Sequence, residues 1–305
     1  MKHLISLNDL SKEEILNILA VAGKLKEESK NGTKHHILEG KTLGMIFSKS
    51  STRTRVSFEV GMYQLGGMAL FLSDRDIQLG RGESIYDTAN VLSQFLDGIM
   101  IRTFDQQDVT DLAHFGTIPV INGLTDDEHP CQILADFQTV YEQKGRLEGM
   151  KLAYVGDGNN MAHSFLNGCT KIGMDISIAS PEGYMCAEKY IKQAQDSAAV
   201  SGSKVVITDS PVEAVKGADV VVTDTWVSMG QESEKAERLK IFMPYQVNSE
   251  LWKHADSDAM FLHCLPAYRG YEVTEDIIDG PMSLIFQEAG NRLHAQKAVM
   301  ALLMG

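Results

Sequence analysis

The sequence contains no run of about 18 apolar residues, and residues 1–9 lack the apolar segment of a signal peptide. We therefore expect neither a transmembrane helix nor a secretory leader, and we predict a cytoplasmic protein that does not bind membranes. Basic residues are also in short supply, because 28 lysines and arginines stand against 41 aspartates and glutamates. The resulting net charge of -13 argues against general binding of nucleic acids, which requires a basic surface.

Only four cysteines are present, Cys131, Cys169, Cys186 and Cys264, and no two of them have C-x-x-C spacing. A disulfide framework and a structural zinc site are therefore not expected. The sequence also lacks an H-E-x-x-H motif and any clustered set of histidines and cysteines, so we predict neither a metal nor another cofactor. Three of the cysteines are expected to pack as small hydrophobic residues, and Cys264 alone is a functional candidate.

The chain is long enough for two domains of about 150 residues each, and its composition is that of an ordinary globular protein. Short apolar segments alternate with segments of helical periodicity along the sequence. This alternation is typical of parallel sheets covered by helices on both faces. Strands are expected at residues 42–47, 68–72, 98–103 and 118–122, and then at 151–157, 175–180, 204–209, 218–225 and 259–264.

These elements predict an α/β fold with two doubly wound parallel-sheet domains, joined by interdomain helices, with the active site in the cleft. We place the first domain at residues 1–130 and the second at 131–290. The helix predicted over 131–144 would bridge them. The apolar positions of the last segment have helical spacing, so residues 291–305 are expected to form a helix that packs back on the first domain.

A run of hydroxyl residues and two arginines, residues 47–55, follows the first predicted strand and opens a helix expected over 56–65. At such a junction the first helical N–H groups have no partner within the helix, and the positive end of the helix dipole faces outward. The guanidinium of Arg53 or Arg55 can hold two phosphate oxygens at once. The run predicts an anion-binding site, although for S-T-R taken alone a hydroxyl N-cap beside two solvated arginines is the simpler explanation.

Polar residues also follow other predicted strands, and in open parallel sheets ligands bind beyond the carboxyl ends of the strands. In the first half these residues are Arg102 and the segment 129–132. In the second half they are the segments 157–160, 224–230 and 263–266. An aspartate at a strand end is often only a helix cap, and a single histidine is often structural. Together, however, these segments predict one site between two domains.

The glycines after the strand at 151–157 invite comparison with a dinucleotide-binding motif. Gly156 and Gly158 match the first two glycines of G-x-G-x-x-G, but the third is missing. Asn159 and Asn160 occupy the space that a pyrophosphate would need, and the next strand does not end in an acidic residue. The pattern therefore argues against a nicotinamide or flavin site and against an NAD-dependent dehydrogenase.

Five motifs occur in a fixed order: S-T-R-T-R at 51–55, H-P-C-Q at 129–132, D-G-N-N-M-A-H-S at 157–164, D-T-W-V-S-M-G-Q-E at 224–232, and H-C-L-P at 263–266. With them the chain resembles the ornithine carbamoyltransferases over nearly its whole length. The first two motifs are shared by transcarbamylases generally, whereas D-x-W-x-S-M-G and H-C-L-P are more specific to the ornithine branch. The resemblance implies transfer of the carbamoyl group of carbamoyl phosphate to the δ-amino group of L-ornithine, giving L-citrulline and phosphate in arginine metabolism.

The resemblance also implies which residues bind the donor. The first domain would bind carbamoyl phosphate, and Arg102 and His129 would stabilise the negative charge that grows on the carbamoyl oxygen. Gln78 matches a position that in this family reaches a neighbouring subunit's site, so a homotrimer or a higher multiple of trimers is implied. The implied donor set is Ser51, Thr52, Arg53, Thr54, Gln78, Arg102, His129, Gln132, Cys264, Leu265 and Arg292.

For the acceptor, the resemblance implies that Asn160 and the backbone around Met229 bind the carboxylate of ornithine in the second domain. Asp224 and Ser228 would bind an ammonium group. The δ-amine must lose a proton before it attacks, and Cys264 beside Asp224 is the candidate pair that positions or deprotonates it. A buried packing thiol is the alternative for Cys264. The implied catalytic residues are Arg102, His129, Asp224 and Cys264.

Two details of the sequence bear on this resemblance. The polar segment 228–234 is predicted to act as a lid that closes over the second substrate and excludes water. Gly290 stands where the family usually has a glutamate, so a charge beside Arg292 is missing and the orientation of this arginine needs an explanation.

Two kinds of alternative remain open from the sequence. One is a transcarbamylase for a related acceptor, such as aspartate, putrescine or acetylornithine. The other is a non-catalytic binding protein that keeps the anion site, although such a protein has no need for Asp224, His129 and Cys264 together at strand ends. The residues do not distinguish a biosynthetic from a catabolic role.

Overall fold

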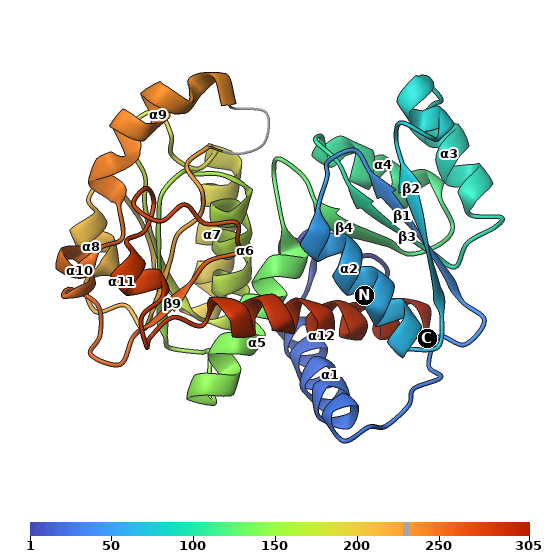
Figure 1. Cartoon of the computed structure of the whole chain (residues 1–305), viewed down its shortest axis with the longest axis horizontal. Helices are drawn as coiled ribbons and strands as arrows, with labels where there is room; N and C mark the ends of the chain where they lie inside the picture. Colours follow the sequence, from blue (N-terminus) through green and yellow to red (C-terminus); the bar gives the residue numbers. More distant parts are fainter. Residues whose placement is uncertain (228–231) are drawn as a thin grey trace. The chain divides into compact units, whose positions relative to one another are not determined.

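The computed structural model in Figure 1 describes residues 1–227 and 232–305. Ser228 and Met229, and most of the predicted lid, lie outside the described residues. The chain divides into two compact units, Met1–Gln138 with Gly290–Gly305, and Thr139–Ala289. The two boundaries fall within helices α5 (Pro130–Lys144) and α12 (Ile285–Met304). No helix of the described residues is long and apolar enough to cross a membrane.

The first unit contains a four-stranded sheet in the order β2-β1-β3-β4, with all neighbouring strands parallel. Its strands are β1 (Thr42–Phe47), β2 (Met68–Ser73), β3 (Gly98–Arg102) and β4 (Val120–Leu124). Its helices are α1 (Lys12–Lys30), α2 (Thr52–Gln64), α3 (Ile85–Leu92), α4 (Gln106–Phe115) and the short 3-10 turns η1 (Leu7–Asp9) and η2 (Gln78–Arg81).

The second unit contains a five-stranded parallel sheet in the order β7-β6-β5-β8-β9. Its strands are β5 (Lys151–Val155), β6 (Asp175–Ala179), β7 (Val205–Thr208), β8 (Val220–Val222) and β9 (Met260–Leu262). Its helices are α6 (Asn160–Ile172), α7 (Glu188–Ser201), α8 (Pro211–Val215), α9 (Lys235–Phe242), α10 (Ser249–Trp252) and α11 (Glu275–Ile278), with 3-10 turns η3 (Glu232–Glu234) and η4 (Met243–Tyr245).

The two sheets confirm the predicted α/β fold with two parallel-sheet units, and the differences concern the ends of elements. The strand expected over 218–225 ends at Val222, and the Thr223 hydroxyl then donates to the backbone oxygen of Val155 at 2.6 Å. The last helix begins at Ile285 rather than at 291. Gly290, a poor helix former, lies within it, which is why the sequence pattern suggested a later start.

Each sheet has a point at which the strand order reverses, and the predicted site residues lie there. In the first unit β1 lies between β2 and β3, and in the second β5 lies between β6 and β8. Ligands of doubly wound sheets bind beyond the carboxyl ends of the strands at these points. Residues 48–51 follow β1 and Arg102 ends β3, while residues 157–160 follow β5 and Asp224 follows β8.

The helix that follows β5 is held firmly by burial. Residues 161–170 of α6 are all buried, so this helix lies inside the second unit rather than on its surface. On the other face of the sheet, Val155, Val221 and Phe261 pack in a core cluster with residues of α8, α10 and α11. The strand ends around Asp224 are therefore supported by apolar packing on both faces.

The turn between β5 and α6 depends on a close approach of two backbone segments. A Cβ atom at Gly158 would lie 2.3 Å from the backbone nitrogen of Cys186 and 2.3 Å from the backbone carbon of Met185. Real Cβ atoms do not approach backbone atoms so closely, so one of the two segments would have to move. Glycine at 158 thus fixes where α6 begins.

We expect Gly158→Ala to destabilise the protein by about 1–3 kcal/mol, because the added methyl group must displace backbone. Urea denaturation and thermal melting measure this change. Gly23→Ala in α1 is the matched control, since a Cβ there meets nothing within 4 Å and alanine is the better helix former. Equal melting temperatures for the two variants would contradict a constraint at Gly158.

Candidate active site

The loop between β1 and α2 forms the predicted anion site in the first unit. Ser51 is the N-cap of α2, and its side-chain oxygen accepts a hydrogen bond of 3.1 Å from the backbone N–H of Thr54. The backbone N–H of Ser48 donates to the carbonyl of Arg102 at 2.9 Å, which joins this loop to the end of β3. The positive end of the α2 dipole therefore lies close to Arg102, the last residue of β3.

A cavity of about 400 Å³ lies against this loop. Residues 48–52 line it, together with Arg55 and residues around the end of β2 that include Phe71 and Arg75. Lys49 also lines it and is itself buried; its ammonium pairs with Asp126. The sequence prediction did not include Lys49, although its position within the hydroxyl-rich run was a visible signal.

The structure separates the two arginines of the loop. The guanidinium of Arg55 lies 3.7 Å from the centre of the Phe71 ring, and its Nε is 2.9 Å from Glu59 Oε1. The charge of Arg53 instead acts on the buried His129, whose pKa it helps to lower. Arg53, which is half-buried, therefore acts on the buried group described next, and Arg55 borders the cavity.

Five of the predicted donor residues come together in a buried group. Arg292 in α12 donates from Nη1 to Gln132 Oε1 at 2.6 Å and from Nη2 to Thr54 Oγ1 at 3.2 Å. Gln132 in turn donates to Asp136 Oδ1 at 2.8 Å. Arg102 at the end of β3 and His129 just before α5 are also buried. Residues from α2, α5 and α12 thus form one polar cluster in the first unit.

The electrostatics of this cluster determine the state of His129. Burial lowers its pKa well below the ordinary value, and the nearby charges of Arg292, Arg102 and Arg53 lower it further. The imidazole is therefore neutral at pH 7, with one ring nitrogen as donor and the other as acceptor. A neutral imidazole beside arginines suits donation of a hydrogen bond to an oxygen that gains negative charge.

One predicted donor residue, Gln78, lies outside this cluster, and one residue not predicted for the site, Cys131, lies beside it. Gln78 is exposed in η2, and the residues that line the cavity do not include it. Cys131 is buried beside the cluster, and burial raises the pKa of its thiol to about 12. Its Sγ lies 3.4 Å from the backbone oxygen of Asn122, so it packs as a structural thiol, as expected.

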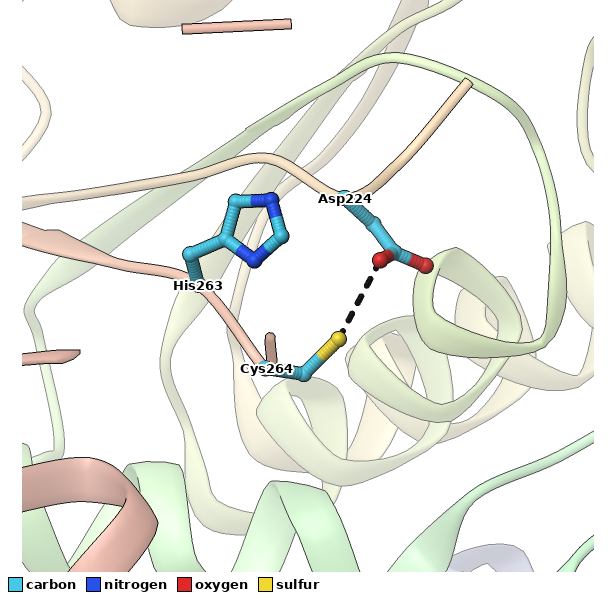
Figure 2. A group of neighbouring side chains, drawn as sticks. All are labelled: Asp224, His263 and Cys264. Atoms are coloured by element: carbon cyan, nitrogen blue, oxygen red, sulfur yellow. Dashed lines mark hydrogen bonds between the residues drawn. The ribbon is translucent and has the colours of Figure 1, made fainter. Parts of the chain in front are cut away.

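In the second unit, Asp224 accepts several hydrogen bonds, of which Figure 2 shows the one from Cys264. Its Oδ1 accepts from Cys264 Sγ at 3.1 Å and from the backbone N–H of Thr225 at 2.7 Å. Its Oδ2 accepts from Asn159 Nδ2 at 2.9 Å. These bonds fix a buried carboxylate at the strand ends, and its remaining lone pairs can accept from a cationic ligand.

The role of Asn159 was missed, because the sequence prediction selected its neighbour Asn160. The side-chain oxygen of Asn159 accepts from the N–H groups of Met161 and Ala162, so this residue is the N-cap of α6. Its amide nitrogen is the group that reaches Asp224. The capping position was visible in the sequence, but a bond to a residue 65 positions later was not. Asn160 is the first residue of α6 and is half-buried.

The H-C-L-P segment turns sharply after β9. Leu265 has a φ of 56°, in the left-handed region that favours glycine, and its N–H donates to His263 Nδ1 at 2.9 Å. His263 Nε2 lies 3.2 Å from Glu272 Oε1, and its backbone N–H donates to Glu288 Oε2 at 2.8 Å. Two buried carboxylates and an imidazole therefore hold this turn, which carries Cys264.

Asp224, His263 and Cys264 are the described residues that could hold a metal ion, since their ligand atoms lie within 4.8 Å of one another. Both ring nitrogens of His263 are engaged, one with Leu265 and the other with Glu272. A metal would have to displace one of these bonds. The three side chains are accordingly better suited to hydrogen bonding than to coordination.

A further residue that the sequence did not reveal is Arg238 in α9. This buried guanidinium donates from Nε to the backbone oxygen of Trp226 at 2.5 Å and pairs with Asp157. It also lies 4.9 Å from the centre of the Tyr184 ring. Burial raises the pKa of Asp157, and the charge of Arg238 opposes that shift. Arg238 thus ties together the chain segments that follow β5 and β8, and no local motif marks it.

Comparisons with known proteins agree with this geometry. A model of the aspartate/ornithine carbamoyltransferase carbamoyl-P binding domain matches residues 2–142, and one of the Asp/Orn binding domain matches residues 148–303. An ornithine carbamoyltransferase of Anoxybacillus flavithermus is 59% identical over 303 residues, 99% of this chain and 96% of the relative.

Solved structures give the same result. The ornithine carbamoyltransferase from Pyrococcus furiosus superposes with a TM-score of 0.97 at 57% identity, covering 100% of this chain and 97% of the other. The anabolic ornithine carbamoyltransferase from Campylobacter jejuni has a TM-score of 0.92 at 42% identity, with 99% of both chains covered.

Two parallel-sheet units, one with a buried cationic cluster and the other with a buried carboxylate beside a thiol, are the architecture of a two-substrate carbamoyl-transferring enzyme. With both family models matched over nearly the full length, the chain belongs to the aspartate/ornithine carbamoyltransferase family. The three relatives described above all belong to its ornithine branch.

The lowered pKa of His129 predicts a loss of stability at acid pH. The unfolded histidine has an ordinary pKa of about 6.5, so below that pH the unfolded state takes up a proton that the folded state does not. The contribution is fully present above about pH 6.5 and falls by up to about 1.4 kcal/mol per pH unit below it.

Urea unfolding of the wild type and of His129→Asn at about pH 7.5 and about pH 5.5 isolates this contribution. We expect the free energy of unfolding to fall less in the variant, because asparagine does not titrate. An equal fall in both proteins would mean that His129 titrates normally in the folded state.

Proposed function

We propose that this chain transfers the carbamoyl group of carbamoyl phosphate to the δ-amino group of L-ornithine, giving L-citrulline and phosphate. The observation that carries the proposal is the buried cluster in which Arg102, Arg292 and neutral His129 lie with the N-terminus of α2. A chain of net charge -13 has little reason to bury so much positive charge except to bind an anion.

In the first unit, the phosphate of the donor would bind the hydroxyls and N–H groups of residues 51–54, with Arg53 as counter-charge. Arg102 and His129 would donate to the carbamoyl oxygen, and Gln132 would hold the carbamoyl nitrogen. As the amine attacks the carbonyl carbon, negative charge grows on that oxygen, where fixed donors in a dry site have their largest effect. The C–O bond to phosphate then breaks, and phosphate leaves with the electron pair.

In the second unit, the buried carboxylate of Asp224 would bind an ammonium group of ornithine, and Asn160 would bind the carboxylate. The thiol of Cys264 already donates to Asp224, so the two can share a proton path with the attacking amine. The N–C bond forms from the neutral amine, which loses its proton to solvent or to this pair. Ser228 and Met229 would also bind ornithine, whereas Leu265, in the turn held by His263, would contribute to binding of carbamoyl phosphate.

We also propose a biosynthetic direction. The name of the Pyrococcus furiosus relative, 57% identical over 304 residues, describes it as anabolic, and so does that of the Campylobacter jejuni structure. A role in arginine biosynthesis is consistent with these names. The cytoplasmic location expected from the sequence stays a prediction.

A homotrimer is part of the proposal, and an exposed apolar face of the first unit supports association between copies. This face consists of Val56, Val60 and Tyr63 of α2 and Met68, Leu70 and Phe71 of β2. Tyr63 is 82% exposed, and β2 is an edge strand of its sheet. Edge strands with exposed apolar side chains are typical sites of association.

The same edge borders the donor cavity, since Phe71 belongs to the apolar face and also lines the cavity. Gln78 follows β2 in the chain and is exposed. A neighbouring copy that packs on this face could therefore insert its Gln78 toward the cavity. We propose that Gln78 acts in the site of the next subunit rather than in its own.

The choice of acceptor is tested by incubating the protein with carbamoyl phosphate and, separately, ornithine, putrescine, aspartate or acetylornithine. Ureido product and phosphate are measured together, because hydrolysis releases phosphate alone. We expect equal amounts of citrulline and phosphate with ornithine. Turnover with another acceptor and none with ornithine would reject the assignment, and no product with any acceptor would favour a binding protein.

Asp224→Asn is the matched variant for this assay, because it removes the charge and keeps the shape. The loss of a buried ion pair with the substrate should lower kcat/KM for ornithine about 100-fold or more. Inhibition by inorganic phosphate should remain unchanged, since phosphate binds in the first unit. A variant that lost both properties would indicate general disruption of the fold.

The role of Gln78 is tested by mixing two variants, Gln78→Ala and Arg53→Ala, each of which should have very low activity. If Gln78 serves the neighbouring subunit, dissociating and reassociating an equal mixture should restore about a quarter of wild-type activity, because some sites receive both intact residues. No recovery, in mixtures shown by light scattering to exchange subunits, would mean that Gln78 acts within its own chain.

A further inference from the structure

Gln296 lies in α12 one turn beyond Arg292, and its side chain is fully buried. Amide oxygen and nitrogen are assigned from their partners. With the oxygen toward Arg292, it accepts from Nη2 at 3.0 Å and from Nε at 3.1 Å, while the nitrogen is 2.5 Å from Ser57 Oγ. The opposite orientation would place amide donors against guanidinium donors, so the first is the correct assignment.

In this orientation the side-chain oxygens of Gln296, Gln132 and Thr54 all accept from the guanidinium of Arg292, and we call these three acceptors its bracket. Nη1 donates to Gln132 Oε1, and Nη2 also donates to Thr54 Oγ1. Gln296 takes the remaining edge, formed by Nε and Nη2. Since a guanidinium is planar, acceptors from α5, α2 and α12 on different edges fix both its position and its plane.

The bracket extends into the anion-binding loop. Ser57 Oγ, which receives the Gln296 amide, donates to the backbone oxygen of Arg53 at 2.7 Å. Gln296 is therefore connected through Ser57 to the first turn of α2, where the phosphate is proposed to bind. A change at residue 296 would therefore shift both the guanidinium of Arg292 and the first turn of α2.

The three oxygens that bracket Arg292 are all neutral, two from amides and one from a hydroxyl. A carboxylate in the place of Gln296 would hold the guanidinium equally well, but it would offset its charge. These neutral acceptors orient the cation without adding negative charge of their own. The same field helps to keep His129 neutral.

We propose that Gln296 is the positioning residue that orients Arg292 toward carbamoyl phosphate, an inference that rests on the proposed function. It also answers the question raised by Gly290. A Cβ at residue 290 would meet nothing within 4 Å, so no packing in the described structure depends on a side chain there. The plane of Arg292 is set from residue 296 instead.

The test replaces Gln296 with methionine, which has similar volume and no comparable acceptor. Loss of an acceptor to a charged group corresponds to about a tenfold change or more. We expect KM for carbamoyl phosphate and the inhibition constant of inorganic phosphate each to rise about tenfold, with KM for ornithine within about twofold of wild type.

Gln64→Met is the matched control. Gln64 Oε1 accepts from Lys297 Nζ at 3.0 Å, and Lys297 is the residue after Gln296 in α12. The variant therefore removes a hydrogen bond of Lys297 and leaves those of Arg292 given above intact. It should lower the melting temperature without changing KM for carbamoyl phosphate. Wild-type turnover of ornithine is measured first, and its absence would refute the proposed function rather than the role of Gln296.

Gln296→Glu separates orientation from charge, and it keeps the test valid if the methionine variant does not fold. It retains the acceptor for Arg292 but loses the donor to Ser57, so the melting temperature should fall less than in Gln296→Met, while the added charge should raise KM for carbamoyl phosphate about tenfold. The proposal is wrong if folded Gln296→Met or Gln296→Glu binds the donor as wild type does, or if Gln64→Met weakens donor binding equally.

Discussion

The donor half of this enzyme depends on positive charge buried inside an acidic protein. Arg102 and Arg292 are buried and Arg53 is half-buried, and all three act on the buried His129. Burial of cationic groups is unfavourable unless an anion or oriented oxygens compensate. The oxygens of Gln132, Gln296 and Thr54 supply orientation without negative charge.

The second unit holds the opposite kind of group, a buried carboxylate. Asp224 receives hydrogen bonds from a thiol, an amide and a backbone N–H, which together replace the water lost on burial. Each donor comes from a different strand end, namely those of β5, β8 and β9. The parallel sheet thus supports a site that no single segment of the chain could build.

The sequence predicted the two parallel sheets and most strand-end residues, because alternating apolar segments and hydroxyl-rich turns are local patterns. It did not predict Asn159, Arg238 or Gln296 as parts of the site. Their importance comes from contacts with residues far away in the chain, and a glutamine or arginine within a helix carries no local sign of its partner. The start of the last helix was predicted too late for a similar reason: α12 continues through Gly290, because tertiary packing supports it there.

The position of Arg292 and Gln296 near the end of the chain has a consequence for synthesis on the ribosome. The first unit takes its loop and strands from residues before 139, but its polar cluster is completed only by Gly290–Gly305. A nascent chain that has not reached Arg292 has all the strands of the first sheet but lacks a central member of this cluster. The polar cluster of the first unit can therefore form only after the last residues of the chain have been made.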